Sequence, residues 1–457
     1  MSTAPPSFTR SLKMVGALFI ILSVITPASS IFVIAPGVLQ QAGSGAFLSF
    51  VAGAFACLFT AFVYAELSSA FPLTGGEYAI VGHILGPLAG FIILGINFVT
   101  LILVVTVLAL GVSHYLNIIF VDLSPVVTGV TTVLIATLFA VLNIKVNALI
   151  TGFFLALEML ALAIMTYLGF THTYRPFSDL WQHPLHLGMT GGLDPTSLSL
   201  IGLSTSVAIF AYNGYGTAVY LGEEMHDASR QIARTILGSL FISIVAEALP
   251  VTAVLLGAPD LTSLFSAENP FSSFIAVRGG HLMNILMSLC IALAIINANI
   301  ASMVIASRML FSTGRDHVWT ASINQSLSLI HKRYHSPWVA TLICGVLASL
   351  ACFINLTLLL VITGTTIVVV YGALCLAALV GRRNKTTSHA TYRMPFFPLP
   401  PLLALVVLLY VIYANYMDVA IGRPSLWVTL GISAVSTAYY YFILQRRGAW
   451  VLHRDTN

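Results

Sequence analysis

The stretch ITPASSIFVIAPG, from Ile25 to Gly37, interrupts an otherwise apolar segment with Thr26, Pro27, Ser29 and Ser30. Proline lacks a backbone N–H and its ring obstructs the preceding turn, so we expect the helix to break here. Unpaired N–H and C=O groups cannot face lipid, and such a break is stable only where protein or a water-filled cavity surrounds it. The break therefore predicts a place where backbone groups are free to bind a polar ligand.

An alternative is that Pro27 only kinks a continuous helix whose serine hydroxyls bond back to nearby carbonyls. A second candidate break, Asn213-Gly214-Tyr215-Gly216 within IFAYNGYGTAVYLGEE, argues against that alternative. Two interrupted segments in corresponding halves of a membrane chain are typical of a transporter's central binding site. The pair favours a site for a small zwitterion.

The composition is that of an integral membrane protein. Hydrophobic residues make up 58% of the 457, and charged residues only 7%. A membrane span needs about 20 consecutive apolar residues. On that criterion we predict twelve transmembrane helices in an all-α fold, with no soluble domain: Met14–Leu39, Phe47–Phe71, Leu85–Ile119, Pro125–Leu142, Ala148–Phe170, Leu198–Gly222, Thr235–Leu256, Leu282–Phe311, Trp338–Asn355, Thr357–Val380, Leu399–Met417 and Leu426–Leu444.

The basic residues predict the orientation. If the N-terminus is cytoplasmic, sixteen of the nineteen Lys and Arg residues, including Arg454, lie on the cytoplasmic side of these spans. Only Arg175, Arg278 and Arg423 lie on the other side. Because cytoplasmic loops carry an excess of Lys and Arg, we expect a multi-pass protein of the plasma or inner membrane with both termini in the cytoplasm.

Four features together resemble the amino acid–polyamine–organocation superfamily, and its amino acid permeases in particular. They are the broken first helix and the runs AELSSAFPLTGGEY from Ala65, GEEMHDASRQIARTI from Gly222 and SRMLFSTGRD from Ser307. The resemblance implies a LeuT-like fold of two inverted five-helix repeats, with helices one and six discontinuous. Residues 1–170 would form the first repeat with a short cytoplasmic N-terminus, 171–380 the second, and 381–457 two peripheral helices and the cytoplasmic C-terminus.

The resemblance also implies a substrate site at the two breaks. Backbone N–H groups of Ser29, Ser30 and Ile31 would bind a carboxylate. Carbonyl groups would bind an ammonium, and those belong to Ile25, Phe210, Ala211 and Asn213. Helix-end physics gives the same assignment, since an N-terminus attracts anions and a C-terminus offers free carbonyls. The chain departs from the superfamily's glycine-rich run here, because it has Ala28-Ser29-Ser30.

Other polar residues fall near this expected site. Asn97 and Ser302 occupy places where similar transporters contact the substrate side chain, although each can equally bridge neighbouring helices. Phe210 can cover the substrate as an aromatic lid or face lipid.

Three glutamates lie in apolar surroundings, where a carboxylate costs about 2.5–3.5 kcal/mol unless it has a partner, water or a proton. Glu66 lies at a helix end, where it caps, contacts a gate or serves as a structural carboxylate. Glu158 lies in mid-helix, where similar permeases often carry a lysine, and is our first candidate for proton coupling. Glu247 is the second candidate, with the alternative that it bonds backbone groups freed by Pro250.

The sequence has no phosphate-binding loop, HExxH motif or nucleophile elbow, so we expect no enzyme activity. Cysteines lie inside apolar spans without metal-ligand spacing, and we expect no metal, no cofactor and no nucleic-acid partner. The leading hypothesis is an amino acid transporter that works as a proton symporter or an exchanger. Alternatives are a polyamine or amine permease of the same fold, or a nutrient sensor or channel. The substrate, the coupling ion and the oligomeric state stay open.

Overall fold

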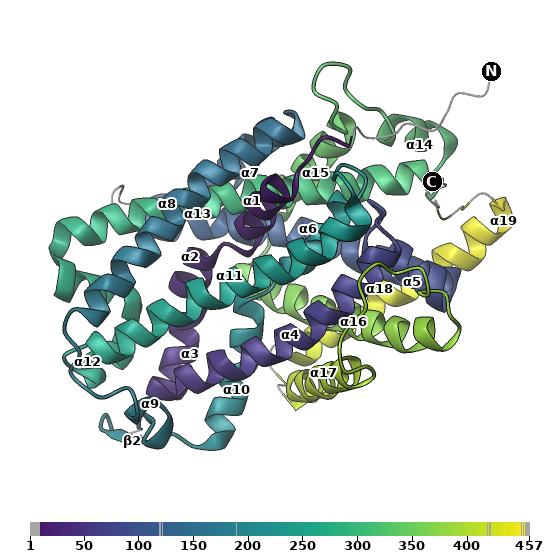
Figure 1. Cartoon of the computed structure of the whole chain (residues 1–457). Coiled ribbons are helices and arrows are strands. Elements are labelled where there is room, and N and C mark those ends of the chain that lie inside the picture. Colours follow the sequence, from purple (N-terminus) through teal and green to yellow (C-terminus); the bar gives the residue numbers. More distant parts are fainter. Residues whose placement is uncertain are drawn as a thin grey trace.

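The chain folds almost entirely into helices (Figure 1). The computed structural model describes residues 10–117, 120, 122–188, 190–417, 419, 422–448, 450 and 452. The all-α class expected from composition is confirmed. One short antiparallel pair of strands, β1 (Leu185–Leu187) and β2 (Leu193–Pro195), lies in the loop predicted after the fifth span.

The longer helices run through the molecule, and shorter helices and turns form its ends and its breaks. The longer ones are α4 (Ala46–Ala70), α6 (Pro87–Leu116), α7 (Pro125–Ala140), α8 (Ile144–Phe170), α11 (Ala228–Gly257), α13 (Pro270–Arg315), α15 (Trp338–Ala351), α16 (Leu356–Arg383), α17 (Leu399–Met417) and α18 (Gly422–Tyr439). The shorter ones are α1 (Met14–Ile25), α2 (Pro27–Ser29), α3 (Ala35–Ala42), α5 (Glu77–Leu85), α9 (Asp179–Gln182), α10 (Leu198–Ala211), α12 (Leu261–Ser266), α14 (Ala321–Leu327) and α19 (Gln445–Arg447), with the 3-10 turns η2 (Gly43–Gly45) and η3 (Tyr215–Leu221) and the π turns η1 (Ser30–Ile34) and η4 (Tyr440–Leu444).

The first apolar segment breaks at Thr26, between α1 and α2. Thr26 has a left-handed backbone, with φ 47° and ψ 73°, which is rare for a β-branched residue. Pro27 follows as the first residue of α2, a position where its missing N–H costs nothing. The break is therefore a change of chain direction with a new helix start, and a simple proline kink is excluded.

The sixth segment breaks where α10 ends at Ala211, and the chain continues after a turn as η3. Gly214 in that turn has φ 124°, a conformation that favours glycine. A Cβ at Gly214 would lie 2.9 Å from Ile25 Cγ1 and 3.1 Å from the Ile25 backbone nitrogen. The two breaks are thus in direct contact, and glycine permits the close approach.

Among the described residues, eight helical stretches are long and apolar enough to cross a membrane. One of them, Met14–Ala70, contains both the broken segment and α4, and α7 and α15 are shorter apolar helices. The sixth predicted span is divided between α10 and η3, neither of which is long enough alone. The membrane class is clear from these helices, and the count of twelve stays a prediction.

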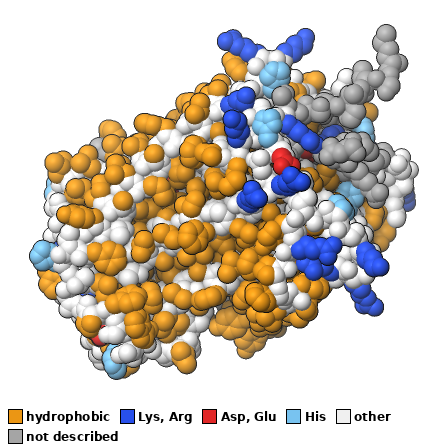
Figure 2. Space-filling model, viewed as in Figure 1, with side chains coloured by type: hydrophobic (Ala, Val, Ile, Leu, Met, Phe, Trp, Pro, Cys, Tyr) orange, Lys and Arg blue, Asp and Glu red, His pale blue; other side chains and the backbone are white. Residues whose placement is uncertain are grey.

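The molecule has two chemically different ends. Lys and Arg side chains gather where α14 and α19 lie, and hydrophobic side chains cover the rest of the face in view (Figure 2). We call this the basic end. The opposite end carries α9, β2 and α12 (Figure 1). Arg454 and Ile119, which belong to the predicted orientation and spans, lie outside the described residues.

Side chains on the flanks suit a lipid environment. Leu138 is 70% exposed and Leu149 is 71% exposed. In the interior, α4 packs against α11 and α6 against α13, while α1 contacts α8, α11 and α13. The broken first segment is therefore enclosed by longer helices.

The crossing of α8 and α11 depends on glycine. A Cβ at Gly169 would lie 2.3 Å from the backbone oxygen of Ala253, whereas a Cβ at Gly372 in α16 would have open space. We predict that Gly169→Ala lowers the melting temperature of the purified protein in detergent, because overpacking typically costs about 1–3 kcal/mol. Gly372→Ala is the matched control and should be neutral or slightly stabilising. Equal melting temperatures for the two variants would contradict the close helix contact.

Candidate functional site

A cavity of about 180 Å³ lies between the two breaks. Its walls come from both interrupted segments and from α4, α5, α6, α13 and α16. On α6 its lining residues extend from Asn97 to Gly111, which corresponds to about 21 Å of helix at about 1.5 Å per residue. The cavity is therefore an elongated space inside the helix bundle.

The structure brings most of the predicted substrate residues to this one cavity. Its lining includes Ile25, Ser29, Ser30, Asn97, Phe210, Ala211, Asn213 and Ser302. Ile31 is different, because its side chain is fully buried and it does not line the cavity. The half-helix begins at Pro27, and Ile31 lies in the π turn that follows it.

The start of α2 has one free backbone donor. The Ala28 N–H donates to Glu158 Oε1 at 2.7 Å, and the Ser30 N–H donates to the Thr26 carbonyl at 3.0 Å. The Ser29 N–H has no hydrogen-bond partner among the described residues. A helix N-terminus with a free donor beside a cavity can accept an anion. Of the three predicted donors, Ser29 alone is free in this conformation.

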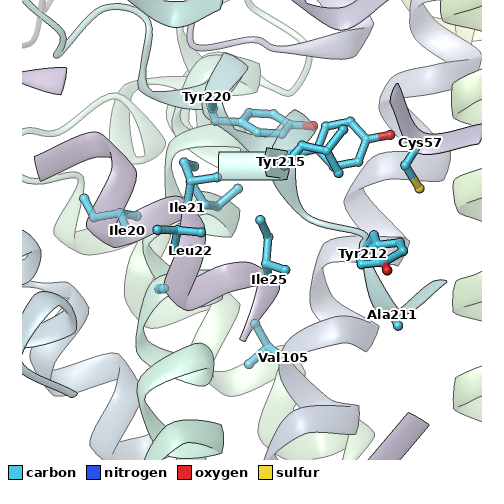
Figure 3. Close-up of a cluster of buried hydrophobic side chains, with 14 of the residues drawn as sticks. Ile20, Ile21, Leu22, Ile25, Cys57, Val105, Ala211, Tyr212, Tyr215 and Tyr220 are labelled. Atoms are coloured by element: carbon cyan, nitrogen blue, oxygen red, sulfur yellow. The ribbon is translucent and has the colours of Figure 1, made fainter. Parts of the chain in front are cut away.

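The carbonyl groups at the breaks are partly used. The Ala211 carbonyl accepts a hydrogen bond from Ser30 Oγ at 2.8 Å, and the Phe210 carbonyl accepts one from the Asn213 N–H at 3.1 Å. The Asn213 side chain accepts a hydrogen bond from the Tyr371 hydroxyl. Ile25 lies at the end of α1 and points toward the segment that follows Ala211 (Figure 3). The Ser30 bond ties the two breaks together across the cavity wall.

Ser302 carries an unused polar group at the cavity. Its side chain is only 2% exposed, and its hydroxyl has no hydrogen-bond partner within the part of the chain that the structure describes. Buried hydroxyl groups are normally paired with protein or water. An unpaired hydroxyl that lines a cavity is available to a ligand. This agrees with the role that the resemblance to similar transporters implies for Ser302.

Glu158 meets the first break. Its Oε1 atom accepts hydrogen bonds from the Ala28 N–H and, at 3.1 Å, from the Thr26 hydroxyl, and its Oε2 atom has no partner among the described residues. The carboxylate is fully buried on α8. It therefore occupies the N-terminus of α2, a contact between residues 130 positions apart.

Glu247 approaches the same half-helix from α11. Its Oε1 atom accepts a hydrogen bond from Ser243 Oγ at 2.7 Å, and the Ser30 hydroxyl lies close enough to interact with it. Its Oε2 atom has no partner within the described chain. Within the described chain, Glu247 interacts with the hydroxyl groups of Ser243 and Ser30. The alternative that it bonds backbone groups freed by Pro250 is therefore wrong.

Glu66 has a structural role. It forms a two-point ion pair with Arg382, with both N–O distances at 2.6 Å, and it also accepts the Met394 N–H at 2.8 Å. These contacts join α4, the end of α16 and the loop before α17. Of the three roles expected for Glu66, the role of a structural carboxylate agrees with these contacts.

The sequence reasoning missed Glu77, which lines the cavity from the first turn of α5. It accepts hydrogen bonds from the Tyr64 hydroxyl at 3.1 Å and from Asn97 Nδ2 at 3.3 Å, and Tyr220 also bonds to it. Burial raises the pKa of Glu77, while the hydrogen bonds from Tyr220, its own N–H and Tyr64 lower it. The available signal is an acidic residue directly after Gly75-Gly76, within the AELSSAFPLTGGEY run.

Buried ion pairs cross-link the helices near the basic end. Arg308 Nε lies 2.6 Å from Glu224 Oε1, and Arg315 Nη1 lies 2.6 Å from Glu223 Oε2. The Tyr78 hydroxyl donates to Asp316 at 2.8 Å. These residues belong to the runs that carry the resemblance to permeases, and they connect α5, α13 and the segment before α11.

Taken together, a bundle of apolar helices encloses a ligand-sized cavity at two helix breaks, with a free helix N-terminus on its wall. These features define a multi-pass membrane transport protein. The amino acid permease family model matches residues 12–440, and the chain belongs to that family.

The chain is also similar to named transporters. It is 23% identical to the branched-chain amino acid permease of Bacillus subtilis (strain 168), over 96% of this chain and 92% of that protein. It is 23% identical to the methylthioribose transporter of the same strain, over 92% and 90%. It is 28% identical to the human large neutral amino acids transporter small subunit 2, over 73% and 62%.

The buried pair at the basic end gives a prediction about stability. Arg308→Met leaves Glu224 as an uncompensated buried charge, and we expect a loss of about 3–5 kcal/mol. The double variant Arg308→Met, Glu224→Gln removes both charges and should regain much of the loss. Thermal unfolding in detergent measures both effects, with the exposed Arg333→Met as control. A single variant as stable as this control would contradict the assigned pair.

Proposed function

We propose that the protein is a secondary active transporter that moves amino acids across the cell membrane by alternating access. The observation that carries the proposal is the cavity enclosed by two interrupted helices in contact with each other. Membership of the amino acid permease family supports it.

The proposed architecture has twelve transmembrane helices in two inverted repeats. The first repeat covers residues 1–170 and contains α1 to α8, the second covers 171–380 and contains α10 to most of α16, and 381–457 adds α17 and α18. The gathering of Lys and Arg at one end supports a cytoplasmic location for the basic end and for both termini (Figure 2).

The proposed substrate pose places the carboxylate at the start of α2 and the ammonium at the carbonyl end of α1. The free Ser29 N–H supports the first contact, and the position of Ile25 as the last residue of α1 supports the second. We withdraw Ile31 from the proposed contacts, because it lies off the cavity. The Ser302 hydroxyl is available for a further contact.

The proposed substrate has an uncharged, apolar side chain. The cavity wall beyond the breaks is formed by Leu101, Val104 and Leu108 of α6 and by Ile367 and Val370 of α16. Apolar walls favour apolar side chains by removing them from water. Two transporters similar to this chain are named for branched-chain and for large neutral amino acids, which agrees with this choice.

Other functions can be tested alongside amino acid transport. A polyamine permease needs a carboxylate facing the cavity for the second ammonium, Glu77 is such a carboxylate among the described lining residues, and competition by polyamines in an uptake screen tests this alternative. A channel or a sensor would not exchange one labelled substrate for another. The similarity to a methylthioribose transporter adds a sugar thioether as a candidate.

An uptake screen in proteoliposomes tests the function. We expect saturable uptake of leucine, isoleucine or valine, accelerated by unlabelled substrate on the other side of the membrane. The matching amine without a carboxylate should compete at least about tenfold more weakly, because it cannot bind the α2 N-terminus. Equal competition by the amine would rule out the proposed pose, and uptake without countertransport would rule out a carrier.

We further propose that Glu158 couples transport to a proton. Its carboxylate bonds to the same helix start that would receive the substrate carboxylate, and Glu247 lies on the neighbouring α11. Two anions at one helix end repel each other in a low-dielectric interior. A proton on Glu158 relieves the repulsion, so proton and substrate binding favour each other.

The variant Glu158→Gln tests this coupling. Glutamine keeps the size and the accepting oxygen but cannot carry the proton, so exchange of labelled substrate should continue while acceleration by an inward proton gradient is lost. The control is Glu268→Gln, which removes an exposed carboxylate outside the cavity. If Glu158→Gln still responds fully to the gradient, Glu158 is not the proton carrier and Glu247 is the next residue to test.

A further inference from the structure

Glu77 gives the cavity a negative charge that the transport scheme above does not use. Among the described residues that line the cavity, it is the one with an acidic or basic side chain. Its side chain is 5% exposed, so little bulk water screens the charge. A ligand in the cavity therefore experiences this carboxylate without a compensating cation on the wall.

The hydrogen-bond donors around Glu77 favour its ionised form and oppose its burial, which raises the pKa overall. Its side-chain partners are the hydroxyls of Tyr64 and Tyr220 and the amide of Asn97, from α4, η3 and α6. Asn97 also donates to Tyr220 at 3.1 Å, which leaves the Tyr220 proton for Glu77. The residue also lies in the first turn of α5, where a helix favours an anion.

The backbone before Glu77 is shaped for this arrangement. Gly76 has φ 61°, and a Cβ there would lie 2.5 Å from Cε1 of the Tyr220 ring. Glycine at this position lets Tyr220 pack against the chain and reach the carboxylate. The next residue, Tyr78, points instead to Asp316 near the basic end. The first turn of α5 thus presents a fixed carboxylate to the cavity.

Glu77 lies on the side of the cavity toward the basic end. Its hydrogen-bond partner Asn97 is the first residue of α6 that lines the cavity. Gly111 is the last, at the opposite end of that lining. Its partner Tyr64 contacts the ring of Tyr371 at 5.4 Å, and Tyr371 bonds to Asn213 at the second break. A substrate that leaves the two breaks toward the basic end therefore passes this carboxylate.

We propose that Glu77 is a charge filter that excludes amino acids with acidic side chains from this transporter. The inference rests on the proposed function and adds a specificity-determining residue to it. The substrate carboxylate is held at the α2 N-terminus, which leaves an acidic side chain without a cation on the described wall and in repulsion with Glu77. Neutral side chains carry no such penalty.

Isosteric pairs of competitors test the filter. Glutamate and glutamine differ in charge but hardly in shape, as do aspartate and asparagine. We would measure the inhibition constants of all four against uptake of a labelled neutral amino acid in proteoliposomes. For the wild type, we expect glutamate to inhibit at least about tenfold more weakly than glutamine, which corresponds to about 1.4 kcal/mol. In Glu77→Gln this ratio should fall at least about threefold, because the repulsion is lost while the cost of placing an unpaired carboxylate in the cavity remains.

The ratio separates the filter from a merely structural role. A change in expression, folding or gate opening alters the inhibition by both members of a pair, whereas loss of the charge alters the acidic member. Glu268→Gln, at an exposed site outside the cavity, is the matched control and should keep the wild-type ratio. If Glu77→Gln does not fold, Asn97→Lys provides a second test, because its ammonium would neutralise Glu77 and lower the ratio.

The outcomes are distinct. An unchanged ratio in Glu77→Gln, or a wild type that binds glutamate as well as glutamine, overturns the filter while leaving amino acid transport intact. If no amino acid inhibits or enters at all, the proposed function itself fails. A ratio that falls in Glu77→Gln and stays high in the control supports the filter.

Discussion

The structure depends on one constraint, which is that backbone polar groups must be satisfied in an interior without bulk water. Breaking the first segment at Thr26 releases N–H and C=O groups that a continuous helix would have paired. Glu158 takes the Ala28 N–H, and Ser30 reaches the Ala211 carbonyl of the other break. Each of these contacts requires α8 and α10 to lie close to the broken segment. The break therefore determines which helices surround the cavity.

The buried carboxylates show how partners decide what an acidic residue does. Glu66 and Glu224 face arginines and hold helices together, because a buried charge with a well-placed opposite charge is a structural unit. Glu158 and Glu247 each keep one oxygen without a partner among the described residues, which leaves a place for a proton. Glu77 is surrounded by neutral donors and faces the cavity. The same side chain thus clamps helices together at Glu66 and Glu224, and it carries the proposed proton site and the proposed filter at the other positions.

Much of the fold was predictable, because its strongest signals are local. Apolar composition and helix length predicted an all-helical membrane protein, and Pro27 and Gly214 predicted the two breaks. Most of the expected site residues line one cavity, since breaks in corresponding segments are brought together by the packing of the bundle. The exact start of α2 at Pro27 was not predictable, and Ile31 lies in the core and not at the cavity.

The sequence by itself determined the membrane class, the positions of the breaks and the asymmetry of basic residues, since hydropathy, proline geometry and charge are properties of each segment alone. Only the tertiary structure decided that Glu158 bonds to Ala28, that Glu247 meets hydroxyl groups, and that Glu77 faces the cavity. These contacts depend on how each helix is rotated about its axis and on which distant helix packs beside it. Such rotations arise from the packing of the whole bundle, and periodicity within one apolar helix carries little information about them.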